Sequence, residues 1–272
     1  MRKTGNLRHS RRDVLRAGGC FVAAALAGTG AAWASEIIRL GDAEDAFARE
    51  GFSGTFAAFD ARADRLIMLN ASRAETRFVP ASTFKIPNSL IALEVGALKD
   101  ADEVFRYDGK PRRVAAWQKD MTLREAVTAS NVPVFQEIAR RVGLENYKAW
   151  LSKLDYGNRE TGEIVDRFWL DGPLTISAIE QARFLARFAE QALPMSARSQ
   201  AIVRDIIRIE EKDGRALFAK TGWDGKIGWW AGWVEREDRK TAFALNMDMS
   251  KSADAPKRIQ IGRALLAHLG VY

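Results

Sequence analysis

Two side chains with the means for covalent chemistry, Ser82 and Lys85, lie three positions apart in the segment 80–87. At the start of a helix, this spacing places both on one face of the first turn. A serine hydroxyl is a weak nucleophile until a neighbouring base takes its proton. Lysine, with an ordinary pKa of about 10.4, can be that base only if apolar surroundings keep it neutral or if it is converted to an acid. Phe84 and Ile86 supply such surroundings, and a helix N-terminus offers N–H groups to an oxyanion. The alternative is a solvated lysine on a surface helix, since about one Ser-x-x-Lys is expected by chance.

A second serine follows in Ser130-Asn131-Val132, between two stretches of helical periodicity. Such a serine can pass a proton from a base to a leaving group. Ser130 equally suits the cap of the helix that begins near Pro133.

The third motif is Lys220-Thr221-Gly222, which ends a strand pattern and precedes Trp223. A cation and a hydroxyl at a strand edge can bind a substrate carboxylate. Gly222 would let a substrate backbone approach closely, and the Trp223 N–H is a second possible oxyanion donor. The alternative is a strand that merely ends in a turn.

Two kinds of patterning must position these motifs. Short apolar runs separated by turn residues predict strands near both ends of the chain, and helical spacing prevails between about 81 and 210. The expected strands are 54–60, 65–70, 215–221, 227–235 and 241–249, and the expected helices are 122–129, 134–141, 177–188, 196–208 and 256–269. This predicts an α/β or α+β fold. An antiparallel sheet of N- and C-terminal segments would be flanked by helices and would carry an inserted helical subdomain. A helix start, an inter-helix loop and a strand end can then meet at one cleft.

The amino-acid composition excludes several kinds of catalytic site. The 272 residues are 47% hydrophobic and 28% charged, which is ordinary for a globular protein. The single cysteine, Cys20, excludes a disulfide framework and a Cys-rich zinc site. The two histidines, His9 and His268, stand at opposite ends of the chain. We therefore expect chemistry that uses neither imidazole nor a metal ion.

The positive charge is concentrated at the N-terminus. Residues 1–34 carry six basic residues against one acidic residue, a net +5 of the chain's +7, so +2 remains for residues 35–272. A body so close to neutrality does not predict nucleic-acid binding. Segment 10–16, Ser-Arg-Arg-Asp-Val-Leu-Arg, is a twin-arginine pattern, followed by an apolar stretch and the cleavage-like Ala32-Trp33-Ala34. We expect a signal peptide at 1–34 and a periplasmic protein without stable membrane association. A basic amphipathic helix or a membrane anchor is the alternative.

Taken in order, the motifs are recognisable. Ser-Thr-Phe-Lys, Ser-x-Val, Tyr156-Gly157-Asn158, Phe168-Trp169-Leu170 and Lys-Thr-Gly resemble the class D (oxacillinase-type) β-lactamases, among the penicillin-recognising serine enzymes. The flanks 86–94, 229–233 and 246–248 agree with this, and the resemblance covers essentially residues 50–270. It implies a β-lactamase/transpeptidase-like catalytic domain at 35–272.

The resemblance also implies a mechanism. Ser82 would attack the β-lactam carbonyl and form an acyl-enzyme. Lys85 would carry CO2 on its amine, as N6-carboxylysine, and act as the general base without any other cofactor. Ser130 would relay a proton to the leaving nitrogen, and Trp169 would donate its indole N–H to the carbamate. Tyr156-Gly157-Asn158 is interpreted as a supporting turn with no chemistry of its own.

The substrate-binding residues follow from the same resemblance. Lys220, Thr221 and Arg258 would hold the substrate carboxylate. The backbone N–H groups of Ser82 and Trp223 would form the oxyanion hole, beside Gly222. Three further residues would line the carbamate pocket: Val132, Phe135 and Leu170.

Two other functions remain open from the sequence. A β-lactam sensor domain would be acylated on the same motifs without turnover, and a D-Ala-D-Ala peptidase would act on peptide substrates. We expect small-molecule β-lactams as partners, no nucleic acid, and a homodimer as an open possibility.

Overall fold

Strand β8 (Ile227–Arg236) sends its large side chains to two sides of a sheet, as the period of a strand requires. Trp229 and Trp233 are buried in one apolar cluster, and Trp230 is buried in another on the opposite face. The computed structural model describes residues 36–40 and 45–272. The predicted signal peptide therefore lies outside the described residues, as do Cys20 and His9.

Within the described residues, seven strands form one sheet in the order β1-β3-β2-β9-β8-β7-β6. Besides β8, its strands are β1 (Glu36–Arg39), β2 (Gly54–Asp60), β3 (Arg65–Leu69), β6 (Arg208–Lys212), β7 (Arg215–Trp223) and β9 (Arg239–Asp248). Strands from the two ends of the chain meet where β2 pairs with β9. This confirms a sheet built by both terminal segments. Neighbouring strands are antiparallel except β1 and β3, which pair in parallel.

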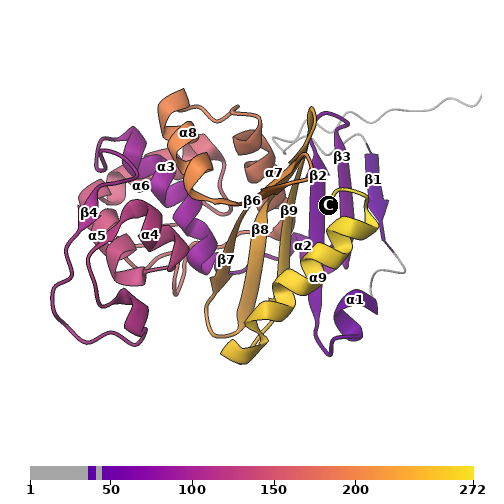
Figure 1. The fold of residues 1–272 in the computed structure, drawn as a ribbon, viewed down its shortest axis with the longest axis horizontal. Coiled ribbons are helices and arrows are strands. Elements are labelled where there is room, and N and C mark those ends of the chain that lie inside the picture. The colour runs from indigo at the N-terminus through magenta and orange to yellow at the C-terminus, as the bar shows by residue number, and fades with distance from the viewer. Residues whose placement is uncertain (1–35, 41–44) are drawn as a thin grey trace, which may run out of the picture. The chain divides into compact units, whose positions relative to one another are not determined.

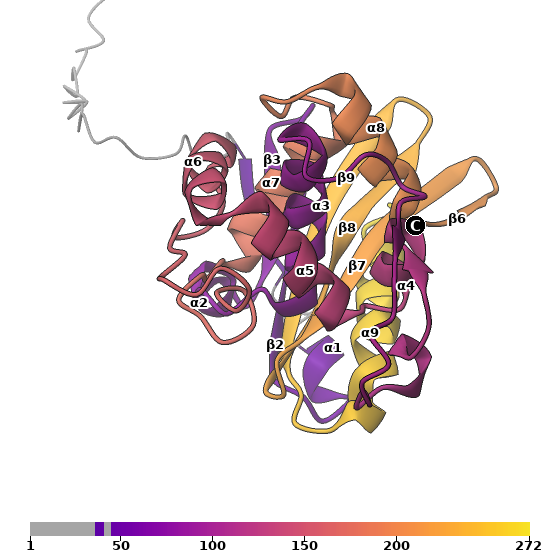
Figure 2. The same ribbon diagram turned by 90° about the vertical axis from the view of Figure 1, so that its left-hand side faces the viewer.

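Helices cover both faces of the sheet (Figures 1 and 2). Helix α9 (Ala255–His268) lies across one face, where Ile261, Leu265 and Leu266 join the cluster around Trp230. Helix α7 (Ala178–Ala189) packs on the other face against β2 and β9. The other helices are α1 (Asp45–Ala48), α2 (Ala71–Glu75), α3 (Lys85–Glu94), α4 (Leu123–Thr128), α5 (Val132–Val142), α6 (Leu144–Leu154) and α8 (Ala197–Ile206).

The inserted region between β3 and β6 is mainly helical, as predicted. It also contains a two-stranded ribbon of β4 (Val104–Phe105) and β5 (Met121–Thr122), which the periodicity does not reveal because each strand has only two residues. The helix expected over 177–188 is α7, and a capping box of Ser177 and Glu180 begins it.

Element ends differ from the predictions by a few residues. The helix expected over 196–208 stops at Ile206, and Arg208 opens β6, an edge strand beside β7. Strand β7 runs on to Trp223, because the Lys-Thr-Gly motif stays paired with β8. Among residues 36–40 and 45–272, no helix combines the length and apolar character needed to cross a membrane.

Candidate active site

Ser82 and Lys85 meet at a helix start. Residues Ala81–Phe84 form a 3₁₀ turn that leads directly into α3, whose first residue is Lys85. Lys85 Nζ donates a hydrogen bond of 3.1 Å to Ser82 Oγ. The predicted pairing of a hydroxyl and an amine on one turn is therefore present.

The surroundings of Lys85 are dry. The residue is 1% exposed, and its Nζ lies 4.8 Å from the centroid of the Phe135 ring. Burial lowers the pKa of the Lys85 amine well below its usual range, and the nearby charge of Lys220 lowers it further. Desolvation penalises the ammonium form, so the neutral amine that a base or a CO2 acceptor requires is favoured here.

Ser130 is held by contacts from outside its own segment. It adopts a left-handed backbone conformation with φ 54°. The cap of α5 is Asn131, whose side chain accepts from the Val134 N–H, so the alternative role of Ser130 as a helix cap is wrong. The Trp117 indole donates to the Ala129 carbonyl at 2.9 Å and supports the turn just before Ser130.

Strand β7 brings positive charge to the same place. Lys220 is 6% exposed, and its Nζ donates to Ser130 Oγ at 3.0 Å and to the Thr221 carbonyl at 3.1 Å. Burial lowers the pKa of Lys220 to about 7, with a smaller contribution from the charge of Arg258. From α9, Arg258 Nη1 donates to the Gly222 carbonyl at 2.8 Å. Arg258 Nε is buried and has no acceptor among the described residues.

A packing contact within the protein explains why residue 222 is a glycine. A Cβ at this position would lie 2.8 Å from the Pro80 carbonyl oxygen and 3.2 Å from Ser82 N. The space on the Cβ side of Gly222 is thus filled by the chain's own 3₁₀ turn, while the approach of a substrate backbone along the strand edge stays a prediction. Glycine is needed there because it lets β7 pack directly against the backbone that carries Ser82.

The same strand presents an N–H group next to Ser82. The Ala219 N–H points away from β8, since it donates to the Ile207 carbonyl. Backbone groups alternate along a strand, so the Trp223 N–H lies on the same edge, beyond the point where β6 stops pairing. The Trp223 indole is fixed by a bond of 2.7 Å to the Met249 carbonyl. This arrangement suits the oxyanion role predicted for the Trp223 backbone.

Trp169 packs against Phe84, which lies between Ser82 and Lys85 in the sequence. Its side chain is fully buried, and its ring stacks on Phe84 with a centroid distance of 5.5 Å. The indole Nε1 is buried and has no acceptor among the described residues. A buried donor without a partner is costly, so an acceptor beside this N–H would be stabilised by it.

The remaining predicted residues lie on neighbouring elements. Phe135 is fully buried, Val132 is half-buried at the start of α5, and Leu170 is half-buried against the core cluster that contains Phe135 and Trp169. No group of three or more His, Cys, Asp or Glu side chains suited to a metal ion occurs within residues 36–40 and 45–272.

Sequence reasoning missed a buried polar pair that supports the 3₁₀ turn. Gln181 Nε2 donates to Thr83 Oγ1 at 3.1 Å, and Thr83 Oγ1 donates to the Pro80 carbonyl at 2.7 Å. The available signal was a glutamine inside the amphipathic pattern of α7, close to the apolar Ile179 and Ala182. Trp117 was missed because its segment has no regular periodicity.

Comparison with known proteins gives consistent results. Residues 46–267 match the family described as the penicillin binding protein transpeptidase domain. β-Lactamase OXA-5 of Pseudomonas aeruginosa is 41% identical over 232 residues, which cover 83% of this chain and 87% of that protein. β-Lactamase OXA-48 of Klebsiella pneumoniae is 45% identical over 201 residues, which cover 72% and 76% respectively. The crystal structure of FUS-1 (OXA-85), a class D β-lactamase from Fusobacterium nucleatum subsp. polymorphum, is similar with a TM-score of 0.83 at 41% identity. It covers 86% of this chain and 99% of that one.

Proposed function

This chain belongs to the class D β-lactamases, and we propose that it hydrolyses the β-lactam amide of penicillin-type antibiotics through an acyl-enzyme on Ser82. The observation that carries the proposal is the 3.1 Å contact between Ser82 Oγ and the buried, easily deprotonated amine of Lys85. A nucleophile and a base in contact within a dry site are what acyl transfer requires.

In acylation, Ser82 Oγ forms a bond to the lactam carbonyl carbon while its proton leaves toward the Lys85 side chain. Negative charge then develops on the carbonyl oxygen, and the backbone N–H groups of Ser82 and Trp223 stabilise it. As the carbon–nitrogen bond breaks, Ser130 relays a proton to the leaving nitrogen: it gives up its own and takes one from the Lys220 ammonium group that donates to it. Ser130 is placed for this role by its hydrogen bond with Lys220.

Carboxylation of Lys85 is part of the proposal. A carbamate on Nζ supplies a stronger hydrogen-bond acceptor and an acid–base group, and its negative charge in the dry pocket needs a hydrogen-bond donor. Trp169 holds it by donating from Nε1, the buried donor that lacks a partner, and Val132, Phe135 and Leu170 limit the access of water. The chain therefore requires CO2 or bicarbonate and no other cofactor.

Lys220, Thr221 and Arg258 bind the substrate carboxylate. Lys220 and Arg258 bring two cationic side chains to the end of β7, where electrostatic attraction in a partly desolvated site is strong. Outside the site, the twin-arginine pattern in residues 1–34 supports export to the periplasm, where the domain at 35–272 would meet β-lactams.

Mass-spectrometric tracking of a penicillin adduct tests the function. We expect a Ser82-linked adduct that disappears as the penicilloate product accumulates, and no adduct in Ser82→Ala. An adduct that persists would instead indicate a sensor, and transfer of the acyl group to an added amino acid or peptide would indicate a transpeptidase.

A further inference from the structure

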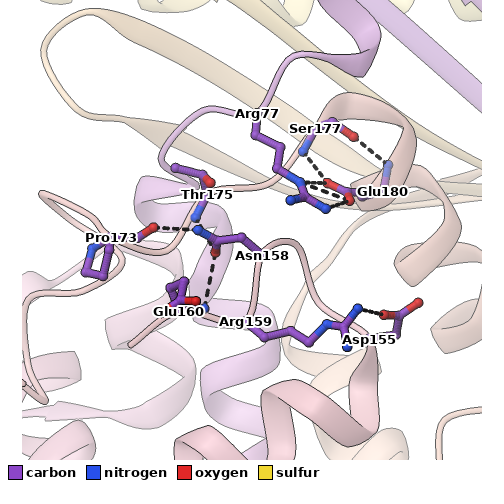
Figure 3. A network of polar contacts seen from close by, with 9 residues as sticks. All are labelled: Arg77, Asp155, Asn158, Arg159, Glu160, Pro173, Thr175, Ser177 and Glu180. Carbon is purple, nitrogen blue, oxygen red and sulfur yellow. Dashed lines mark hydrogen bonds and ion pairs between the residues drawn. The ribbon is translucent and has the colours of Figure 1, made fainter. Parts of the chain in front are cut away.

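Trp169 stands in the middle of a long loop, 158–175, whose two ends are joined by one residue (Figure 3). Asn158 Nδ2 donates to the Pro173 carbonyl at 2.8 Å, and Asn158 Oδ1 accepts from the Thr175 N–H at 3.0 Å. The Asn158 backbone N–H donates to the Thr175 carbonyl at 2.9 Å. A single asparagine thus uses its side-chain donor, its side-chain acceptor and its main chain to close the loop.

The residue before Asn158 makes this closure possible. Gly157 has φ 55°, and a Cβ there would lie 2.1 Å from the Thr175 carbonyl oxygen. No residue with a side chain fits without moving the returning segment of the loop. Gly157 and Asn158 therefore form one joint with residues 173–175, which we call the Asn158 clasp.

The clasp connects to Trp169 through the returning segment. The Leu174 N–H, between the two clasped residues, donates to the Phe168 carbonyl at 3.1 Å. The Phe168 ring meets Trp169 edge-on at 5.0 Å between centroids, and both rings contact Phe84. The hydrogen bond to the Phe168 carbonyl, one residue before Trp169, therefore links the position of the indole to the closed loop.

The clasp also adjoins the path into the Ser82 turn. Ile176, the residue after Thr175, exchanges two backbone hydrogen bonds with Phe78, at 3.0 and 2.9 Å. The neighbouring Arg77 pairs with Glu180, whose carboxylate also accepts from the Ser177 N–H in the capping box of α7 (Figure 3). The loop end is thereby anchored to the chain segment that leads to the nucleophile.

We propose that Asn158 is a positioning residue for the general base: by closing the Trp169 loop, it holds the indole N–H where it retains CO2 on Lys85. This inference rests on the carbamate in the proposed function and extends it to a residue that touches neither substrate nor Lys85. Loss of the clasp leaves Lys85 and Ser82 in place but lets the indole donor move, so CO2 dissociates more readily.

The test measures how turnover of a chromogenic cephalosporin depends on bicarbonate in the full chain. For Asn158→Ala we expect the half-saturating bicarbonate concentration to rise by about tenfold, because the variant loses a partly buried hydrogen bond from the Thr175 N–H and an exposed one to the Pro173 carbonyl. Saturating bicarbonate should restore kcat. Asn158→Asp, which keeps the acceptor for Thr175 and loses the donor to Pro173, should fall between the two. In ¹³C-bicarbonate NMR, the lysine carbamate signal should weaken in the same order.

Asn146→Ala is the matched control, because Asn146 Nδ2 also donates to a backbone carbonyl, that of Val142, in a bond that involves no residue of the loop. Its bicarbonate dependence should equal that of the wild type. Unchanged bicarbonate dependence in folded Asn158→Ala or Asn158→Asp would overturn the inference alone, as would an activity loss that bicarbonate does not restore. A wild type without a carbamate signal would overturn the carbamate of the proposed function and the inference with it.

Discussion

Lys220 Nζ donates a hydrogen bond of 3.0 Å to Ser130 Oγ and so joins strand β7 to the turn that precedes α5. One partner belongs to the sheet and the other to the inserted helical region, 90 positions earlier in the chain. The bond places a hydroxyl beside an amine whose pKa is about 7. A proton can therefore be held or released at this point under neutral conditions.

The pH dependence of kcat/KM should reflect the titration of Lys220. Above a pH of about 7 the free enzyme loses the Lys220 charge, so attraction for the substrate carboxylate weakens and kcat/KM should fall as the pH rises. A bound carboxylate favours the ammonium form, so the alkaline limb of kcat should lie at higher pH than that of kcat/KM. In Lys220→Arg, the limb near pH 7 should disappear because arginine stays charged. Coincident limbs in the wild type would contradict this role.

Trp169→Phe should make turnover depend on added bicarbonate. The substitution keeps an aromatic ring against Phe84 but removes the indole N–H, which has no partner among the described residues. Turnover in bicarbonate-free buffer and in buffer with added bicarbonate measures the effect. Trp150→Phe, at a half-buried position on α6, is the control and should behave like the wild type. A bicarbonate-insensitive Trp169→Phe enzyme would argue against the carbamate.

Lys85→Met should abolish turnover and raise the free energy of unfolding. In the folded state the Lys85 pKa is depressed, so the unfolded chain binds more protons between that pKa and the ordinary value near 10.5. Burial of the amine lowers the free energy of unfolding by its full amount at a pH below the folded-state pKa of Lys85. This loss of stability disappears as the pH rises toward 10.5. Urea unfolding without bicarbonate should show a gain of about 2 kcal/mol or more at low pH, shrinking at high pH.

The control for that stability gain is Lys148→Met. Lys148 is exposed on α6 and forms an ion pair with the exposed Glu145, so its replacement should change the free energy of unfolding by less than about 0.5 kcal/mol. Equal effects at positions 85 and 148 would show that burial of the Lys85 amine costs little.

Gly222→Ala should cause a large loss in the acylation rate and a proportionately smaller loss in thermal stability. The added methyl group would press on the Pro80 carbonyl and on Ser82 N, and would move β7 away from the 3₁₀ turn. The two N–H groups of the oxyanion hole would then no longer converge, which predicts a loss of about 10²-fold in the acylation rate. Stopped-flow acylation together with thermal unfolding measures both quantities. Normal acylation in this variant would mean that the oxyanion donors lie elsewhere.

Local chemistry explains why part of the site was predictable. Ser82 and Lys85 are three residues apart on one turn, so their contact needs only a helix start, and the apolar neighbours Phe84 and Ile86 already predict a dry amine. Likewise, the capping box at Ser177 is a contact over three residues. The apolar run at 227–235 was sufficient to predict the strand that is β8.

Contacts between distant segments decided the rest. Whether Ser130 or Asn131 caps α5 depends on the turn that Lys220 and Trp117 stabilise, and neither of these is a neighbour in sequence. The backbone packed against Gly222 belongs to a segment some 140 positions earlier, so the motif alone does not reveal this contact. The parallel pairing of β1 with β3 likewise depends on where the first strand docks.

By itself, the amino-acid sequence determined the reactive side chains and the family they indicate. These are a serine, a lysine with apolar neighbours, and three motifs in an order that resembles one enzyme family. Tertiary structure alone decided how those reagents are held, including the Lys220–Ser130 bond, the buried Trp169 donor and the Asn158 clasp. The physical reason is the range of the interactions. Helix starts and caps depend on residues a few positions apart, whereas desolvation and shared hydrogen bonds depend on whichever segments the fold packs together.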